Sequence, residues 1–213
     1  MKAFPDPSNS PVHYTQSLTI VSAQLVTAAD TNVGRWIRAF HNIVHLRVDT
    51  RGLDERQVSL VPLQGLSPTV RSLRVDSNSP RHSEVLGLLC SFPLLDDFTL
   101  DAYNGRNGVD EWDPPLTSPR LTGSLGLYIV TQGIGHISHL LLDLPNGLNF
   151  TKIASAYVYE EDLQTMTDLV SRRSGTIESL NVTDCLPGAL PSAEAVFGPS
   201  LTATIGLFQS GFV

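Results

Sequence analysis

Apolar residues recur along the chain in a short strand-like pattern at nearly constant spacing. The pattern is apolar-x-x-apolar-x-apolar, and its central apolar residue, called the anchor below, recurs as Leu18, Leu46, Leu73, Phe98, Leu125, Ile153 and Leu180. Successive anchors are 28, 27, 25, 27, 28 and 27 residues apart. Two copies are imperfect, with Thr122 and Ser155 in apolar positions, and the first copy, at Leu18 and Ile20, lacks the first apolar residue. A period of about 20 to 50 residues indicates stacked structural units.

The segments between the anchors have the apolar spacing of helices, at i, i+3, i+4 and i+7. Such stripes occupy residues 33–40, 85–92, 134–144 and 163–170, and Ser83 is a candidate cap for the second. Pro62 leaves room for only a short or irregular helix within 51–65. Strand and helix therefore alternate, which predicts an α/β solenoid of about six to seven units of about 27 residues. We expect a parallel sheet on one face and helices on the other.

The period also divides the chain. We expect an irregular segment at 1–13, the repeats at 14–185, and a non-periodic tail at 186–213. The solenoid carries the whole of the predicted core.

Residues that alternate with the anchors are predicted to lie on the open, concave face of the sheet, because successive strand residues point to opposite faces. Adjacent strands would place Arg47 beside Arg74, and Asp49 beside Asp76 and Asp101. These charges either pair with one another and solvate the sheet, or form a patch that binds a protein partner, for which Tyr and Arg are favoured residues. Truncations on this face are expected to leave thermal stability nearly unchanged. The candidate partner-binding residues are Arg47, Asp49, Arg74, Asp76, Thr99, Asp101, Trp112 and Tyr128.

Trp112 lies in the long connection between Asp101 and Pro119, within an acidic run. Loops of this length are often functional or disordered. Trp112 either grips a basic partner or folds back to cover the edge of the solenoid.

The charge of the chain narrows the classes of partner. The 213 residues include 14 Lys and Arg against 21 Asp and Glu, for a net charge of −7. We therefore expect neither nucleic acid nor an anionic membrane surface as a partner.

The sequence shows no apolar run long enough for a membrane span and no secretory signal pattern, so we expect an intracellular protein, cytoplasmic or nuclear. The two cysteines, Cys90 and Cys185, lie among apolar neighbours without CxxC spacing, so we expect neither a disulfide framework nor a zinc site.

Candidate chemistry is sparse. His41 and His45 have the i, i+4 spacing of a zinc pair but lack the adjacent Glu and run into a strand. His136 and His139 have no carboxylate at useful spacing, and no nucleophile-elbow or phosphate-loop motif occurs. We expect no metal ion, no cofactor and no catalytic residue, and hence a non-enzymatic chain.

Five segments carry a recognisable pattern of their own: FPLLDD at 92–97, LTSPRLTG at 116–123, LLDLPNGL at 141–148, WIRAF at 36–40 and DLVS at 168–171. Together they resemble the leucine-rich-repeat-like region of F-box proteins from mushroom-forming fungi. In such proteins an N-terminal helical box docks on the Skp-type subunit of a ubiquitin ligase, and the repeats hold the substrate. The resemblance implies a leucine-rich-repeat-like solenoid and the substrate-recognition half of such a protein. The alternatives are a truncated gene product without an independent function and an enzyme on a repeat frame.

Residues 1–13 contain three prolines and no helical stripe, so they cannot form the helical box. We therefore predict that this chain alone does not bind a Skp-type adaptor. A pulldown with purified adaptor tests the prediction, and retention of the chain at micromolar concentration would contradict it.

Overall fold

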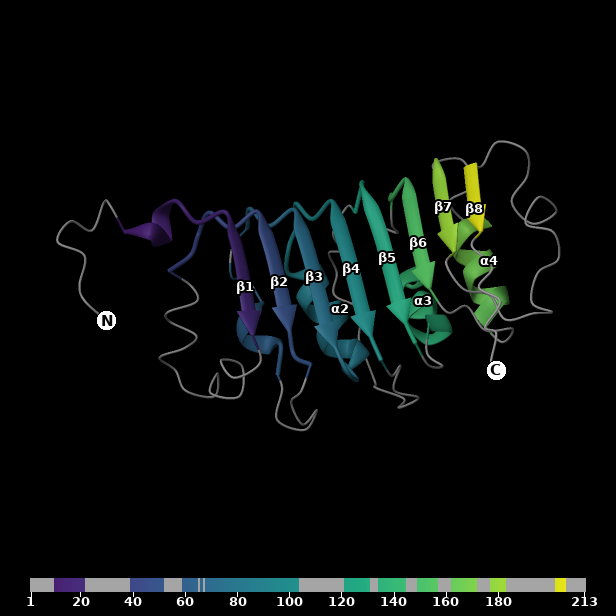
Figure 1. Ribbon diagram of the computed structural model, residues 1–213, viewed down its shortest axis with the longest axis horizontal. Coiled ribbons are helices and arrows are strands. Elements are labelled where there is room, and N and C mark those ends of the chain that lie inside the picture. Colours follow the sequence, from purple (N-terminus) through teal and green to yellow (C-terminus); the bar gives the residue numbers. More distant parts are fainter. Residues whose placement is uncertain are drawn as a thin grey trace, which may run out of the picture.

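The computed structural model describes residues 10–21, 39–51, 59–64, 66, 68–103, 121–130, 134–144, 149–156, 162–171, 177–182 and 202–205. Within these residues the strands form one all-parallel sheet, in which each strand lies beside its neighbour in the chain (Figure 1). The strands are β1 (Ser17–Val21), β2 (His45–Asp49), β3 (Ser72–Ser77), β4 (Asp97–Ala102), β5 (Ser124–Ile129), β6 (Lys152–Ala156), β7 (Ser179–Val182) and β8 (Thr202–Ile205).

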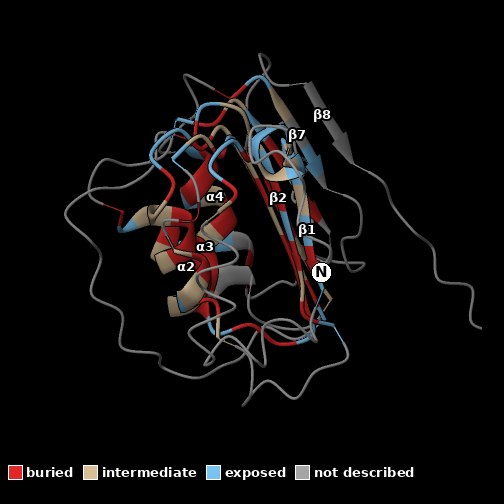
Figure 2. Cartoon of the chain, turned by 90° about the vertical axis from the view of Figure 1, so that its left-hand side faces the viewer, coloured by how far each residue is buried: buried red, intermediate tan, exposed pale blue. Residues whose placement is uncertain are grey.

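Three described α-helices alternate with these strands: α2 (His82–Cys90), α3 (Ile134–Leu142) and α4 (Leu163–Ser171). Two short 3-10 turns, η2 (Pro11–His13) and η5 (Val61–Leu63), complete the described helical elements, and η5 is the short helix expected around Pro62. All three α-helices lie on the same face of the sheet (Figure 2). The predicted alternation of parallel strands and helices is confirmed.

Helix α2 begins earlier than its sequence suggests. Arg81 occupies the N-cap position with no side-chain cap, and Ser83 lies inside the first turn, so the predicted cap is wrong. Glu84 instead accepts a hydrogen bond from the backbone N–H of Leu60 at 2.7 Å, ahead of η5. This contact ties the helix to the preceding unit.

The anchors pair in the register that their spacing predicts. Leu18 faces Leu46 on β2, and the series continues through Leu73, Phe98, Leu125, Ile153 and Leu180 on successive strands. The anchors from Leu46 to Ile153 are at most 2 % exposed. The regular spacing predicts that the anchors from Leu46 to Leu180 stack in one buried column. This is confirmed for these five residues, while the side chain of Leu180 lies outside the described part.

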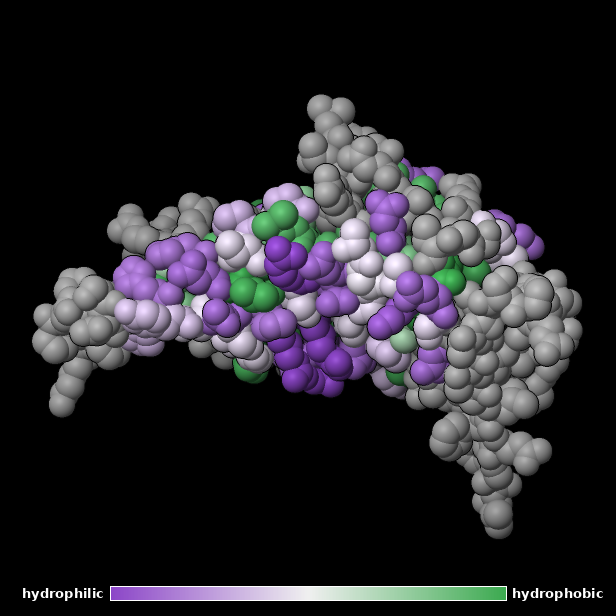
Figure 3. Space-filling model, turned by 90° about the horizontal axis from the view of Figure 1, so that it is seen from above, coloured by the Kyte–Doolittle hydropathy of each residue, from purple (hydrophilic) through white to green (hydrophobic). Residues whose placement is uncertain are grey.

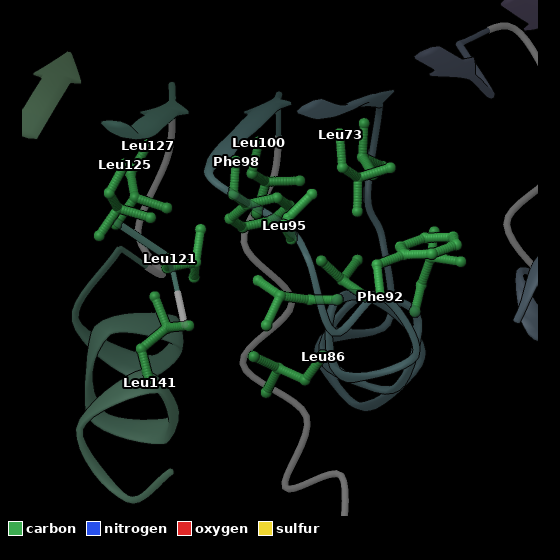
Figure 4. Close-up of a cluster of buried hydrophobic side chains, with 14 of the residues drawn as sticks. Leu73, Leu86, Phe92, Leu95, Phe98, Leu100, Leu121, Leu125, Leu127 and Leu141 are labelled. Carbon is green, nitrogen blue, oxygen red and sulfur yellow. The ribbon is translucent and has the colours of Figure 1, made fainter. Parts of the chain in front are cut away.

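The core lies between the sheet and the helices. Phe98 and Leu125 point from the strands toward Leu86 and Leu141 on α2 and α3, and Phe92 fills the space beside α2 (Figure 4). All these side chains are fully buried. The predicted stripes at 85–92 and 134–144 therefore supply the inner faces of α2 and α3.

The backbone repeats with the same period at the amino ends of the strands. The N–H groups of Val44 and His45 both donate to the carbonyl oxygen of Gln16. The equivalent pairs of N–H groups donate to the carbonyl oxygens of Val44, Arg71, Gly123 and Thr151. The turn into each of these strands is thus built in the same way, although the side chains differ.

The sheet extends into the segment that the sequence predicts to be non-periodic. β8 pairs in parallel with β7, and Ala203 faces Leu180 in the anchor position. A small alanine in place of a large apolar anchor gives no recognisable pattern, which explains why the sequence does not reveal this strand. The predicted helix at 33–40, apart from its last two residues, and the loop that carries Trp112 lie outside the described residues.

Ser155 interrupts the second buried column of the sheet. It faces Leu127 on β5, is completely buried, and its hydroxyl has no hydrogen-bond partner. A buried hydroxyl without a partner costs about 1–3 kcal/mol.

We predict that Ser155→Ala raises the free energy of unfolding by about 1 kcal/mol, because it removes this unpaired hydroxyl. Urea denaturation measures the effect. Ser138→Ala is the matched control, since Ser138 is equally buried but its hydroxyl donates to the sulfur of Met166 at 3.6 Å. Equal changes in the two variants would contradict the prediction.

Candidate functional site

The open face of the sheet, which the described helices leave uncovered, carries the predicted residues in register. Arg47 on β2 lies beside Arg74 on β3, and Thr99 follows on β4. One step toward the carboxyl ends of the strands, a second row contains Asp49, Asp76, Asp101 and Tyr128 on β2 to β5. The structure therefore brings together all the predicted site residues except Trp112, which lies outside the described part.

Asp76 is the centre of this arrangement, and it is buried rather than open. Its side chain is 0 % exposed, although it lies on the face without helices. Nε of Arg47 donates to one carboxylate oxygen at 2.5 Å, and Nε of Arg74 donates to the other at 2.8 Å. The two arginine side chains remain 44 % and 43 % exposed. Asp76 therefore lies on the predicted face but is not itself exposed, because the longer side chains of Arg47 and Arg74 cover it.

The contacts continue on both sides of Asp76. Nη2 of Arg74 donates to Asp101 at 2.8 Å, and Arg51 holds Asp49 through its Nε and Nη2 at 3.2 and 2.9 Å. We call these six residues, Arg47, Asp49, Arg51, Arg74, Asp76 and Asp101, the arginine–aspartate network. Three positive and three negative side chains leave it without net charge.

Arg51 is a member that sequence reasoning missed. It follows β2 and does not belong to the alternating strand positions, but it lies two residues after Asp49. Its side-chain hydrogen bond to Asp49 is the main reason why the pKa of that carboxyl group is lowered from its usual value. The Asp-x-Arg spacing is the sequence signal that could have indicated the pair.

Tyr128 places an aromatic ring beside the arginine–aspartate network. A Cβ atom added to Gly126 would lie 3.0 Å from the Tyr128 ring and 3.1 Å from the hydroxyl of Thr99. The ring therefore lies close to the bare backbone of Gly126, beside Thr99. Asp101 faces Tyr128 across the strand pair, so the aromatic ring adjoins the charged residues. Sequence reasoning named Tyr128 and Thr99 but not the glycine that makes room for the ring.

A second polar cluster lies at the amino ends of the strands, where the described surface is largely hydrophilic (Figure 3). Nη1 of Arg71 donates to Asp96 at 2.9 Å, and the hydroxyl of Thr122 donates to the same carboxylate at 2.7 Å. The bond from Thr122, followed by the bond from Arg71, lowers the pKa of Asp96. Nearby, Asp97 accepts hydrogen bonds from the N–H and hydroxyl of Ser124. These bonds join adjacent units of the repeat.

The described residues offer little reactive chemistry. Burial raises the pKa of the Cys90 thiol to about 12, so this cysteine is protonated at neutral pH and is not a nucleophile. The described part of the chain contains no cluster of three or more histidine, cysteine, aspartate and glutamate side chains arranged to hold a metal ion. Among the same residues, no helix has the length and apolar character needed to cross a membrane.

Comparison of the chain with protein-family models, with curated proteins and with solved structures finds no match.

The burial of Asp76 changes the expected effect of truncating Arg74. We predict that Arg74→Ala lowers the free energy of unfolding by about 1–3 kcal/mol, because one oxygen of a buried carboxylate loses its donor. Arg71→Ala is the matched control, since Arg71 and its partner Asp96 are both well exposed and such pairs contribute at most about 1 kcal/mol. Urea denaturation of both variants is the measurement, and an equal effect would contradict the prediction.

Proposed function

We propose that this chain is a protein-recognition module, a leucine-rich-repeat-like solenoid that binds a protein partner on the open face of its sheet. The observation that carries the proposal is the position of the described helices, which all lie on the opposite face (Figure 2). Parallel sheets are usually covered on both faces. A parallel sheet with one uncovered face is typical of repeat proteins, which use that face for binding.

The repeated turns at the amino ends of the strands support the solenoid. Carbonyl oxygens at steps of 27 or 28 residues, such as those of Gln16, Val44 and Arg71, each accept two N–H groups of the next unit. Identical linkages between successive units are expected when each unit contacts mainly its neighbours.

The arginine–aspartate network supports recognition of a polar protein surface. Within the described contacts, Nη1 of Arg47 and Nη1 of Arg74 make no hydrogen bond, while the remainder of each side chain is held by aspartates. These donors are therefore fixed in place before a partner arrives, which reduces the entropy cost of binding. Tyr128 adds an aromatic surface beside them, and Tyr and Arg are the residue types enriched at binding hot spots.

The resemblance to fungal F-box proteins suggests what such a module recognises. On that basis the partner is a protein substrate for a ubiquitin ligase, and the chain supplies recognition rather than catalysis. The neutral network and the chain's net charge of −7 agree with a protein partner better than with nucleic acid.

Site-specific photocrosslinking tests where the partner binds. A benzoylphenylalanine placed at Thr99 or Ala154 reports on the open face, and one placed at His139 or Gln164 reports on exposed positions of α3 and α4. Crosslinks to one protein from a fungal extract at the first pair of positions only are expected. Crosslinks at the helix positions alone would overturn the proposal.

With the captured partner in purified form, we predict that Tyr128→Ala weakens its binding by more than about 1 kcal/mol. The thermal midpoint should change little, because Tyr128 lies outside the buried core. Tyr14→Ala is the matched control: Tyr14 is 70 % exposed but precedes β1, and its loss should not affect binding. Titration calorimetry measures the affinities, and unchanged affinity of Tyr128→Ala would contradict the prediction.

A further inference from the structure

Two exposed histidines that are far apart in the sequence meet at the amino end of the first strands. Nδ1 of His13, in η2, lies 3.2 Å from Nε2 of His41, which precedes β2. The ring centroids are 5.3 Å apart and the ring planes are tilted by 57°. In the absence of a ligand, one ring can donate a hydrogen bond to the other, depending on the tautomer.

The backbone on both sides of this pair is held in place. Nδ2 of Asn42 donates to the carbonyl oxygen of His13 at 2.7 Å, and the hydroxyl of Thr69 donates to the carbonyl oxygen of His41 at 3.3 Å. Within η2, the N–H of His13 itself donates to the carbonyl oxygen of Ser10 at 3.1 Å. The two imidazoles are thus brought together by main-chain contacts and not only by their mutual hydrogen bond.

The separation of the two nitrogens matches that of two ligands on one metal ion. Zinc binds imidazole nitrogen at about 2.0–2.1 Å, so two such bonds at angles between a right angle and the tetrahedral angle place the nitrogens about 2.8–3.4 Å apart. The observed 3.2 Å lies within this range. Because both side chains are exposed, each ring can turn until its lone pair points at a common position.

We propose that His13 and His41 form a site for a divalent transition-metal ion of the kind that imidazole prefers, with zinc as the ion to test. Among the described residues, no group of three or more histidine, cysteine, aspartate and glutamate side chains includes this pair, so the described part of the chain supplies two ligands. The sequence analysis considered His41 with His45 and His136 with His139, but not His13 with His41, and expected no metal. The spacing of 28 residues between His13 and His41 corresponds to no local metal motif.

A metal ion at this position links the segment before β1 to the segment before β2. It would fasten η2 to the end of the repeat array, where a solenoid needs a cap. An ion that binds the folded chain and not the unfolded one stabilises the folded state, and the thermal midpoint rises with the logarithm of the ion concentration above the dissociation constant. Because only neutral imidazole ligates the ion, acid opposes binding.

The test is a zinc titration of the full chain by calorimetry at neutral pH, with the thermal midpoint measured with and without zinc. We expect one ion per chain, a raised midpoint, and affinity that is at least about tenfold lower in both His13→Ala and His41→Ala. The control variants His45→Ala and His139→Ala remove other exposed histidines and should bind zinc like the parent.

Three results would overturn the proposal: no zinc binding by the parent chain, equal binding by the parent and the two site variants, or weaker binding in the His45→Ala control. In each case the pair would be only a hydrogen bond between side chains. Since His13 and His41 are both exposed, circular dichroism of the variants in the absence of zinc is expected to match the parent. If one of the two site variants loses the circular dichroism signal of the folded chain, the zinc affinity of the other variant tests the proposal.

Discussion

The rest of this structure depends on one constraint: the strands pair in parallel, and every pair has the same register. Each strand places its anchor beside the anchor of the strand before it, so that Leu73 follows Leu46 and precedes Phe98. A parallel connection must return to the same end of the sheet, which requires a crossover and therefore a helix or an equivalent segment. The fixed step of about 27 residues and the apolar inner face of each described helix both follow from this requirement.

The same register creates an electrostatic problem on the open face. Residues at equivalent positions stand side by side about 4.8 Å apart, so Arg47 and Arg74 are neighbours, as are Asp49 and Asp76. Like charges at that distance repel each other. The strands relieve the repulsion by pairing diagonally, since Asp76 accepts hydrogen bonds from Arg47 on the preceding strand and from Arg74 on its own. The network is thus a consequence of the parallel repeat.

The sequence predicts the features that depend on period and alternation, and not those that depend on side-chain reach. The sequence spacing of the anchors predicts the strand register, and the alternation of strand residues between the two faces places Asp76 on the open face. This alternation does not show that two arginines cover Asp76, because the exposure of a side chain depends on the rotamers of its neighbours. For the same reason Arg51 was missed, and β8 was missed because Ala203 is too small to mark an anchor. The contact between His13 and His41 has no local signal at all.

The neutral network also constrains how a partner can bind the open face. Arg74 already donates to two aspartates, so a carboxylate of a partner would have to compete with Asp76, whose burial makes loss of a donor costly. Backbone carbonyl or hydroxyl oxygens of a partner can instead accept from the remaining Nη1 groups without disturbing these contacts. On the proposed function, recognition therefore relies on hydrogen bonds and on the ring of Tyr128 rather than on net charge. Such binding depends only weakly on ionic strength, unlike binding that is steered by net charge.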